Sequence, residues 1–125
     1  WQLDTDFFIL IGPAGIANGN LGSANTVLQS NLADARMGRS VAGAGDVNGD
    51  GYADVIVGAP QYDADGDTPY GGAAFVFHGG PAGIANGNPG TANATLESDL
   101  FSSLMGNSVA GAGDVNGDGY ADVLV

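Results

Sequence analysis

The chain contains the same stretch of sequence twice. Residues 12–57 align without a gap with residues 80–125, which lie 68 residues further on, and 34 of the 46 aligned positions are identical. A fixed period of this kind predicts a repeat architecture, in which each unit buries its apolar face against a neighbour. A period of 68 residues is too long for one coil of a helical or single-strand solenoid and suits a unit of about four strands. The chain therefore holds slightly less than two units.

Short apolar runs recur along the chain and are separated by turns rich in glycine, of which there are 23. No stretch has the periodicity of an amphipathic helix, so the runs predict strands. The expected strands are Phe7–Ile11, Thr26–Ser30, Ser40–Gly45, Asp54–Gly58, Ala73–His78, Ala94–Glu97, Ser108–Gly113 and Asp122–Val125. Two equivalent sets of four short strands indicate an all-β chain, a β-propeller built from four-stranded antiparallel blades.

The position of the repeat boundaries predicts how the blades are divided. In the single repeat module 1–125, residues 40–106 are expected to form a complete blade. Residues 1–39 would supply strands 3 and 4 of one half-blade, and residues 107–125 strands 1 and 2 of another. The chain then holds two blade-equivalents with open sheet edges, which are templates for pairing.

Two blades cannot close a ring, so we expect the chain to self-associate head to tail. The C-terminal half-blade of one copy would complete the N-terminal half-blade of the next. At two blades per chain, a trimer would have six blades and a tetramer eight. The alternatives are a piece excised from a longer propeller, or a designed or reconstructed protein without an evolved function.

One segment of each repeat carries oxygen-bearing side chains at alternate positions, then a glycine, then a further aspartate. Alternate side chains turn inward in such a loop, and Gly51 permits the sharp turn. Three carboxylates, one amide and one backbone carbonyl suit Ca²⁺, which prefers about six to seven oxygens. We therefore expect about two calcium ions per chain. The predicted ligands are Asp46, Asn48, Asp50, the carbonyl of Tyr52, and Asp54 in the first loop, and Asp114, Asn116, Asp118, the carbonyl of Tyr120, and Asp122 in the second.

Other interpretations of these acidic segments are less favoured. The helix–loop–helix calcium hand needs Glu at position 12 of its loop, where this chain has Val57 and Val125. A turn that binds nothing needs only two turn-forming residues, whereas each loop places four oxygen side chains at set spacing. Because protein oxygens occupy every position, the calcium is expected to be structural. Asp63–Asp67 could form a further weak cation site, but a solvated loop is favoured because no additional ligand follows.

The charge of the chain limits its partners. Acidic residues outnumber basic ones by 14 to 2, for a formal net charge of −12, which repels nucleic acids and anionic membranes. No apolar run approaches the ~18 residues that span a bilayer, so no membrane insertion is expected. His78 is the only histidine and there is no cysteine. Without a nucleophile–base pair, the chain is not expected to be an enzyme.

The residues of the loop and its flanks resemble a known family. The acidic motif followed by Val55–Pro60 resembles the FG-GAP repeat, the blade of integrin α-subunit propellers and of many bacterial surface and secreted proteins. Gly72–Gly79 is similar to the third strand of that repeat, and Met37-Gly38 and Met105-Gly106 correspond to its Phe-Gly element, with Met in place of Phe. The resemblance implies calcium in the hairpins between strands 1 and 2, at the ten ligands named above.

The resemblance also implies what such a module does. It predicts a structural or recognition role with a protein ligand, cell adhesion, and a place outside the cell or on its surface. A lectin-like propeller that binds glycans is the alternative, with Trp1, Tyr62 and Tyr70 as a candidate aromatic platform. Propellers of this family usually have seven blades, a number that chains of two blades cannot form.

Overall fold

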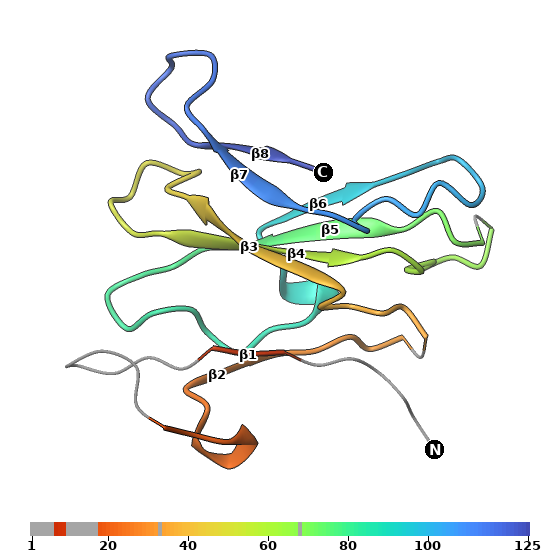
Figure 1. Ribbon diagram of the computed structural model, residues 1–125, viewed down its shortest axis with the longest axis horizontal. Helices are drawn as coiled ribbons and strands as arrows, with labels where there is room; N and C mark the ends of the chain where they lie inside the picture. The colour runs from red at the N-terminus through yellow and green to blue at the C-terminus, as the bar shows by residue number, and fades with distance from the viewer. Residues whose placement is uncertain (1–6, 10–17, 33, 68) are drawn as a thin grey trace.

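The computed structural model describes residues 7–9, 18–32, 34–67 and 69–125, and its secondary structure is almost entirely β (Figure 1). The strands are β1 (Phe7–Ile9), β2 (Thr26–Leu28), β3 (Ser40–Gly45), β4 (Asp54–Ala59), β5 (Ala73–Phe77), β6 (Ala94–Glu97), β7 (Ala110–Gly113) and β8 (Asp122–Leu124). Two single 3₁₀ turns, η1 (Leu21–Ser23) and η2 (Pro89–Thr91), lie before β2 and β6. The all-β prediction is confirmed. Residues 10 and 11 of the first expected strand lie outside the described residues.

The strands form three antiparallel sheets in chain order. The middle sheet has the order β3-β4-β5-β6, and two-stranded sheets β1-β2 and β7-β8 lie on either side of it. In Figure 1 the three sheets are stacked, with β1-β2 below the middle sheet and β7-β8 above it. One whole four-stranded sheet between two half-sheets is the arrangement expected of propeller blades. The division of the chain after residues 39 and 106 stays a prediction.

The two central strands of the middle sheet, β4 and β5, are buried because both of their faces are packed. Successive residues of a strand point to opposite faces, so β5 is buried along its whole length only if both faces are packed. One core lies between β1-β2 and the middle sheet and consists of Leu28, Met37, Val57, Ala59, Ala73, Phe75 and Phe77. The other lies between the middle sheet and β7-β8 and consists of Ala44, Ile56, Ala74, Val76 and Val109.

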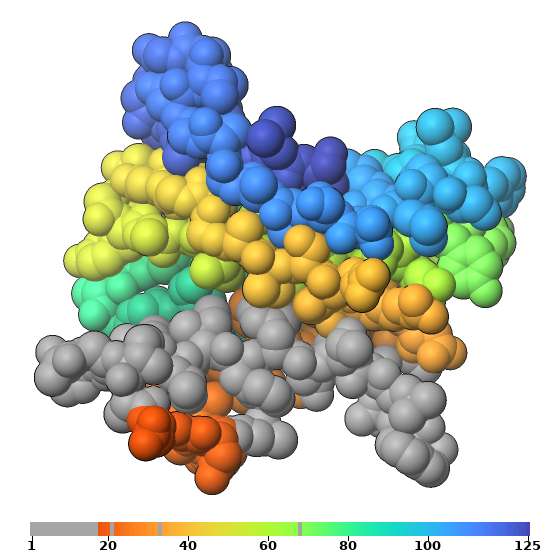
Figure 2. Space-filling model, viewed as in Figure 1, coloured from red at the N-terminus to blue at the C-terminus, as the bar shows by residue number. Residues whose placement is uncertain are grey.

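Small residues allow the middle sheet and the C-terminal half-sheet to approach closely. Strands β3 and β7 contact each other, and Figure 2 shows the blue C-terminal segment against the yellow segment that contains β3. A Cβ atom added to Gly111 would lie 2.5 Å from the carbonyl oxygen of Gly43, and one added to Gly58 would lie 1.9 Å from that of Gly106. Glycine is therefore required at Gly58 and Gly111 for the sheets to stack at this distance.

The first half-sheet differs from the middle sheet in register. Phe75 of β5 pairs with Thr95 of β6, whereas the equivalent Phe7 of β1 pairs with Leu28 instead of Val27. The β1-β2 pairing is thus shifted by one residue relative to the second repeat. A shift of one residue exchanges the two faces of a strand.

Candidate metal-binding loops

The two acidic motifs form the hairpin loops between β3 and β4 and between β7 and β8, at the same end of the sheets (Figure 1). Each loop follows a bulge, where the strand register shifts between Gly43 and Gly45 and between Gly111 and Gly113. Gly45 and Gly113 have φ of 76° and 71°, a conformation that glycine adopts readily. A bulge bends the strand and increases its local twist, and the first aspartate of each loop follows immediately.

Asp46 organises the first loop. Its Oδ1 accepts hydrogen bonds from the backbone N–H groups of Gly49 and Asp50, at 2.7 and 3.0 Å, and its Oδ2 accepts one from Gly51 at 2.8 Å. Gly49 and Gly51 have φ of 76° and 88°, which the turn requires. The carboxylate of Asp46 therefore lies inside a backbone curl.

The middle of the loop is tied together by Asn48 and Asp50. Asn48 Oδ1 accepts from the N–H of Asp50 at 3.2 Å, and Asp50 Oδ1 accepts from the N–H of Tyr52 at 2.9 Å. Asn48 Nδ2 donates to Asp50 Oδ2 at 2.9 Å. The pKa of Asp50 is lowered below its ordinary value. The hydrogen bond from the N–H of Tyr52 is the largest cause, and the bond from the Asn48 amide and the charge of His78 act in the same direction. Asp50 is accordingly ionised near neutral pH.

Asp54 fixes the base of the loop. It is 1% exposed, and its Oδ2 accepts from the N–H of Val47 at 2.8 Å while its Oδ1 accepts from the N–H of Gly79 at 2.8 Å. A buried carboxylate needs such partners to offset the loss of water. Asp54 therefore joins the β3–β4 hairpin to the segment that follows β5. Each of its oxygens has a second lone pair beyond these bonds.

The second loop repeats this pattern 68 residues later. Asp114 accepts from the N–H groups of Gly117, Asp118 and Gly119, at 2.7, 3.0 and 2.8 Å. These hydrogen bonds lower the pKa of Asp114, and the bond from Gly119 has the largest effect. The other hydrogen bonds also match those of the first loop. Asn116 Oδ1 accepts from the N–H of Asp118 at 2.9 Å, and Asp118 Oδ1 accepts from the N–H of Tyr120 at 2.9 Å. Asp122 Oδ2 accepts from the N–H of Val115 at 2.8 Å.

The donor set of each loop fits a hard divalent cation. All of the predicted ligand atoms are oxygens, and carboxylates, amides and carbonyls are the ligands that calcium takes. In the part of the chain that the structure describes, however, no three Asp, Glu, His or Cys side chains converge as a metal would hold them. The carboxylates face backbone amides instead.

The two loops are in contact with each other. A Cβ atom on Gly49 would lie 2.6 Å from Cε1 of Tyr120, so the Tyr120 ring covers Gly49 in the neighbouring loop. The backbone N–H of Ala121 also donates to the carbonyl of Asp46 at 2.9 Å. Sequence reasoning gave Tyr120 only a carbonyl role and missed this contact. The repeat itself does not indicate which turn of one unit lies against which turn of the next.

His78 also borders the first loop. Its Nδ1 lies 3.1 Å from Asn48 Nδ2, a contact that the sequence did not predict, since it placed His78 only at the end of an expected strand. The signal for this contact was the position of His78 directly after β5, at the end of the strand that lies beside the loop.

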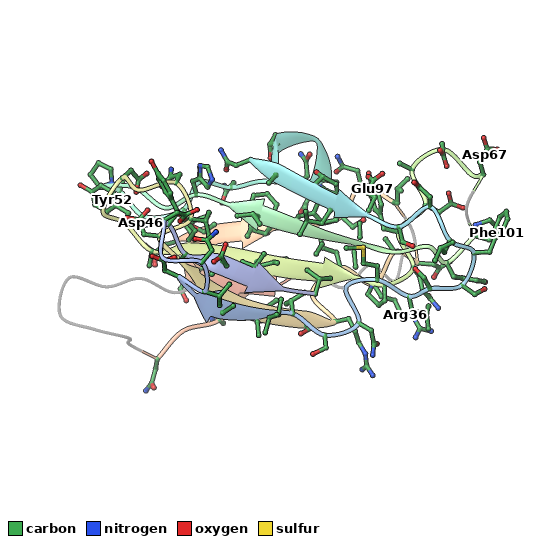
Figure 3. All side chains as sticks on the ribbon, turned by 90° about the horizontal axis from the view of Figure 1, so that it is seen from above. Arg36, Asp46, Tyr52, Asp67, Glu97 and Phe101 are labelled. Atoms are coloured by element: carbon green, nitrogen blue, oxygen red, sulfur yellow. The ribbon has the colours of Figure 1, made fainter. Side chains whose placement is uncertain are left out.

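The other candidate residues lie elsewhere. Asp46 and Tyr52 lie at one end of the sheets, and Asp67 and Phe101 at the opposite end (Figure 3). In the Asp63–Asp67 loop, Asp63 and Asp65 accept from the N–H groups of Gly66 and Asp67, at 2.9 and 3.0 Å, as in ordinary turns. Tyr62 packs edge-on against Phe75, with ring centroids 5.0 Å apart. Burial, and then the charge of Glu97, raise the pKa of Tyr62.

Comparison with known proteins agrees with this geometry. The sequence pattern of the family described as FG-GAP repeat matches residues 37–77 and 105–125, which include both loops. These segments are FG-GAP repeats. The first match spans β3 to β5 with the Met-Gly pair that precedes them, and the second includes β7 and β8.

Integrin α subunits are among the relatives of the chain. It is 34% identical to integrin alpha-5 of Xenopus laevis over 90 residues, which is 72% of this chain and 8% of the relative. It is 40% identical to integrin alpha-6 of Homo sapiens over 81 residues, 64% of this chain and 6% of the relative. It is 39% identical to integrin alpha pat-2 of Caenorhabditis briggsae over 90 residues, which is 72% of this chain and 7% of the relative. The chain thus spans less than a tenth of these relatives.

Within the described ranges, no helix has the length and apolar character to cross a membrane.

Proposed function

We propose that the chain is a calcium-binding β-propeller module with a structural and recognition role and without catalytic activity. The observation that supports this most strongly is the double occurrence of one oxygen-rich loop in the hairpins of FG-GAP repeats, each curled around its first aspartate. The similarity to integrin α subunits supports a place outside the cell or on its surface, a role in adhesion, and a protein as the ligand.

Calcium would act as a structural ion in this module. The residues that would hold it are the ten predicted ligands, from Asp46 to Asp54 and from Asp114 to Asp122. Two ions would change the formal charge from −12 to −8, because each carries two positive charges. The contact between Tyr120 and Gly49 places the two loops side by side, so order imposed on one loop would extend to its neighbour.

Removing calcium tests this function. A protein stabilised by a ligand that binds only its native state gains about 2.7 kcal/mol per site at a free ligand concentration of about 100 times Kd. We therefore expect the melting temperature to fall when calcium is replaced by an excess of chelator, and calorimetric titration to give about two ions per chain. Identical melting curves with and without chelator would show that the loops are empty turns.

Matched variants assign the effect to the loops. Asp50→Asn and Asp118→Asn together remove two carboxylates without changing side-chain volume, and we expect this double variant to lose most of its response to calcium. Asp65→Asn makes the same change in the acidic loop at the opposite end of the sheets and should leave the response intact. An equal loss in both proteins would place the ion outside the hairpin loops.

Head-to-tail self-association is the second part of the proposal. The described sheets end in two-stranded halves at both ends of the stack, and such edges pair readily. Three chains would give six blades and four chains eight. The glycan-binding alternative is not proposed, because Tyr62 of its aromatic platform packs against Phe75 and Trp1 lies outside the described residues.

A further inference from the structure

Both hairpin loops contain a dipeptide that is chemically unstable in an unfolded chain. Asn48-Gly49 and Asn116-Gly117 each place a glycine directly after an asparagine. Asparagine is among the thermolabile residues, and glycine, which has no side chain, does not shield its own backbone nitrogen. Asn48 and Asn116 are also predicted ligands of the calcium ions. Their conversion to other residues would therefore change the loops at the positions that matter most.

The reaction that threatens these residues is deamidation. The backbone nitrogen of the glycine loses its proton to a base and attacks Cγ of the asparagine. A new C–N bond forms, the bond from Cγ to Nδ2 breaks, and the released nitrogen takes up a proton and leaves as ammonia. Water then opens the cyclic succinimide at one or the other of its carbonyls, which leaves aspartate or isoaspartate. The glycine N–H must therefore be free to lose its proton.

In both loops that N–H is held by a carboxylate. Gly49 donates to Asp46 Oδ1 at 2.7 Å, and Gly117 donates to Asp114 Oδ1 at 2.7 Å. A hydrogen bond to an ionised acceptor is stronger than a neutral one. Deprotonation would also place a second negative charge beside the carboxylate, and a neighbouring like charge disfavours the charged form. The bond thus opposes the first step of the reaction in two ways.

The asparagine side chains are held as well. Asn48 Oδ1 accepts from the N–H of Asp50 at 3.2 Å, while Asn48 Nδ2 donates to Asp50 Oδ2 at 2.9 Å. In the second loop, Asn116 Oδ1 accepts from the N–H of Asp118 at 2.9 Å. These bonds resist the changes of torsion angle that close the succinimide ring. The electrophile and the nucleophile are therefore both restrained.

We propose that Asp46 and Asp114 protect the asparagines of their loops from deamidation, and that Asn48 and Asn116 are modification sites that react only when the loop opens. The carboxylates would thus have a second role beyond the one as calcium ligands. The inference does not depend on calcium, because the hydrogen bonds that support it are formed by the chain alone.

Either product would alter the loop. Aspartate in place of Asn48 adds a negative charge beside the carboxylates of Asp46 and Asp50. Isoaspartate adds a carbon atom to the backbone, which shifts Asp50 and Asp54 relative to Asp46 and ends the alternation of inward-facing side chains. Protection of Asn48 therefore preserves the spacing of oxygen atoms on which the predicted ligand set is based.

Incubation at mildly alkaline pH tests the protection, with deamidated peptides measured by mass spectrometry. Residues 41–55 and 109–123 are identical, so Asn48 and Asn116 should react at the same rate in urea. A hydrogen bond to a charged group alone lowers the population of the open loop about tenfold or more. In chelator without urea we expect both sites to react more slowly by at least about that factor. Equal rates with and without urea would overturn the proposal.

Crossed variants assign the protection to the aspartates. Asp46→Ala should accelerate the reaction of Asn48 about tenfold or more and leave Asn116 slow, and Asp114→Ala should do the reverse. An unchanged rate at Asn48 in Asp46→Ala, or equal acceleration of both loops by either variant, would contradict a local protection.

A third Asn-Gly pair reports whether a variant has unfolded. Asn86 Oδ1 accepts from the N–H of Val27 at 2.8 Å, and the N–H of Gly87 donates to the carbonyl of Val27 at 3.1 Å. These bonds lie between β2 and the connection from β5 to β6, apart from the hairpin loops. Protection by Asp46 requires that Asn86 keep the rate of the parent chain in Asp46→Ala while Asn48 accelerates.

Hydrogen exchange of the parent chain provides a test that needs no variant. In chelator, the amide protons of Gly49 and Gly117 should exchange much more slowly than in urea. Free exchange at these two amides would overturn the proposal even if both alanine variants unfold. Calcium titration of the parent chain reports on the metal function separately, since loops that deamidate freely could still bind calcium and protected loops could still be empty.

Discussion

The glycines between the sheets mark where a single methyl group would prevent the blades from stacking. A Cβ on Gly58 would lie 1.9 Å from the Gly106 carbonyl oxygen, and the three nearest atoms are all backbone atoms of Gly106, which cannot rotate away as a side chain could. Gly43, in the same sheet, has nothing within 4 Å of the position that a Cβ would take. The two positions therefore form a matched pair, with the same substitution and opposite surroundings.

We expect Gly58→Ala to destabilise the chain by about 1–3 kcal/mol, the usual effect of overpacking a tight interface. Gly43→Ala should change stability by less than about 0.5 kcal/mol, as exposed substitutions do. Urea unfolding of both variants measures the difference. Equal effects would mean that the middle sheet and β7-β8 do not approach as closely as the structure shows.

Sequence spacing predicted the order of oxygen atoms along each loop, but it could not predict where they point. The hydrogen bonds of Asp46 to the three amides of its own turn are local, so they follow from an Asp-x-x-Gly-x-Gly pattern of turn formers. The bond from Gly79 to Asp54 joins residues 25 positions apart, and the contact of Tyr120 with Gly49 joins two repeats. Both contacts depend on how the sheets stack, and the spacing of residues within one loop carries no information about that stacking.

At the scale of elements, the repeat predicted the strands well and their pairing less completely. The eight expected runs all contain a strand, because short apolar runs between glycine turns have few other structures available. The one-residue shift of β1 against β2 has no signal in the sequence. A strand is held in register by the packing of both its edges and faces, and among the described strands β1 pairs with β2 alone, whereas β5 pairs with both β4 and β6.

Asp54 and Asp122 should differ in what they contribute to their hairpins, although their local sequences are identical. Asp54 is buried and accepts from both Val47 and Gly79, whereas Asp122 is half-buried and its bond to Val115 lies at an exposed site. Removing a buried acceptor leaves its donors unsatisfied, which costs about 1–3 kcal/mol. In chelator, where calcium makes no contribution, we expect Asp54→Ala to lower the free energy of unfolding by that amount and Asp122→Ala to lower it much less.

Urea titrations in chelator measure both variants against the parent chain. If Asp122→Ala proved as destabilising as Asp54→Ala, the bond between Asp54 and Gly79 would contribute nothing, and the hairpin would not be tied to β5.

At the scale of the whole molecule, charge opposes the assembly that the sheet edges favour. Each chain carries a formal net charge of −12, and joining several chains brings these charges together. Self-repulsion between like-charged surfaces weakens with ionic strength, since the Debye length falls from about 30 Å at 0.01 M salt to about 10 Å at 0.1 M. The groove beside β8 is lined in part by Val76, Leu96 and Val123, and apolar contacts made by such residues are not weakened by salt in this way.

We therefore expect assembly to become stronger as sodium chloride is raised from about 0.01 M to about 0.1 M at a fixed calcium concentration. Assembly should also be stronger in calcium than in chelator, because two bound ions would change the formal charge of each chain from −12 to −8. Sedimentation velocity across this range measures the shift from monomer to closed ring. Leu100→Lys adds one positive charge away from the groove and should assemble slightly better than the parent chain at low salt. Dissociation on adding salt would be the behaviour of an interface held by ion pairs, and would contradict an assembly that charge opposes.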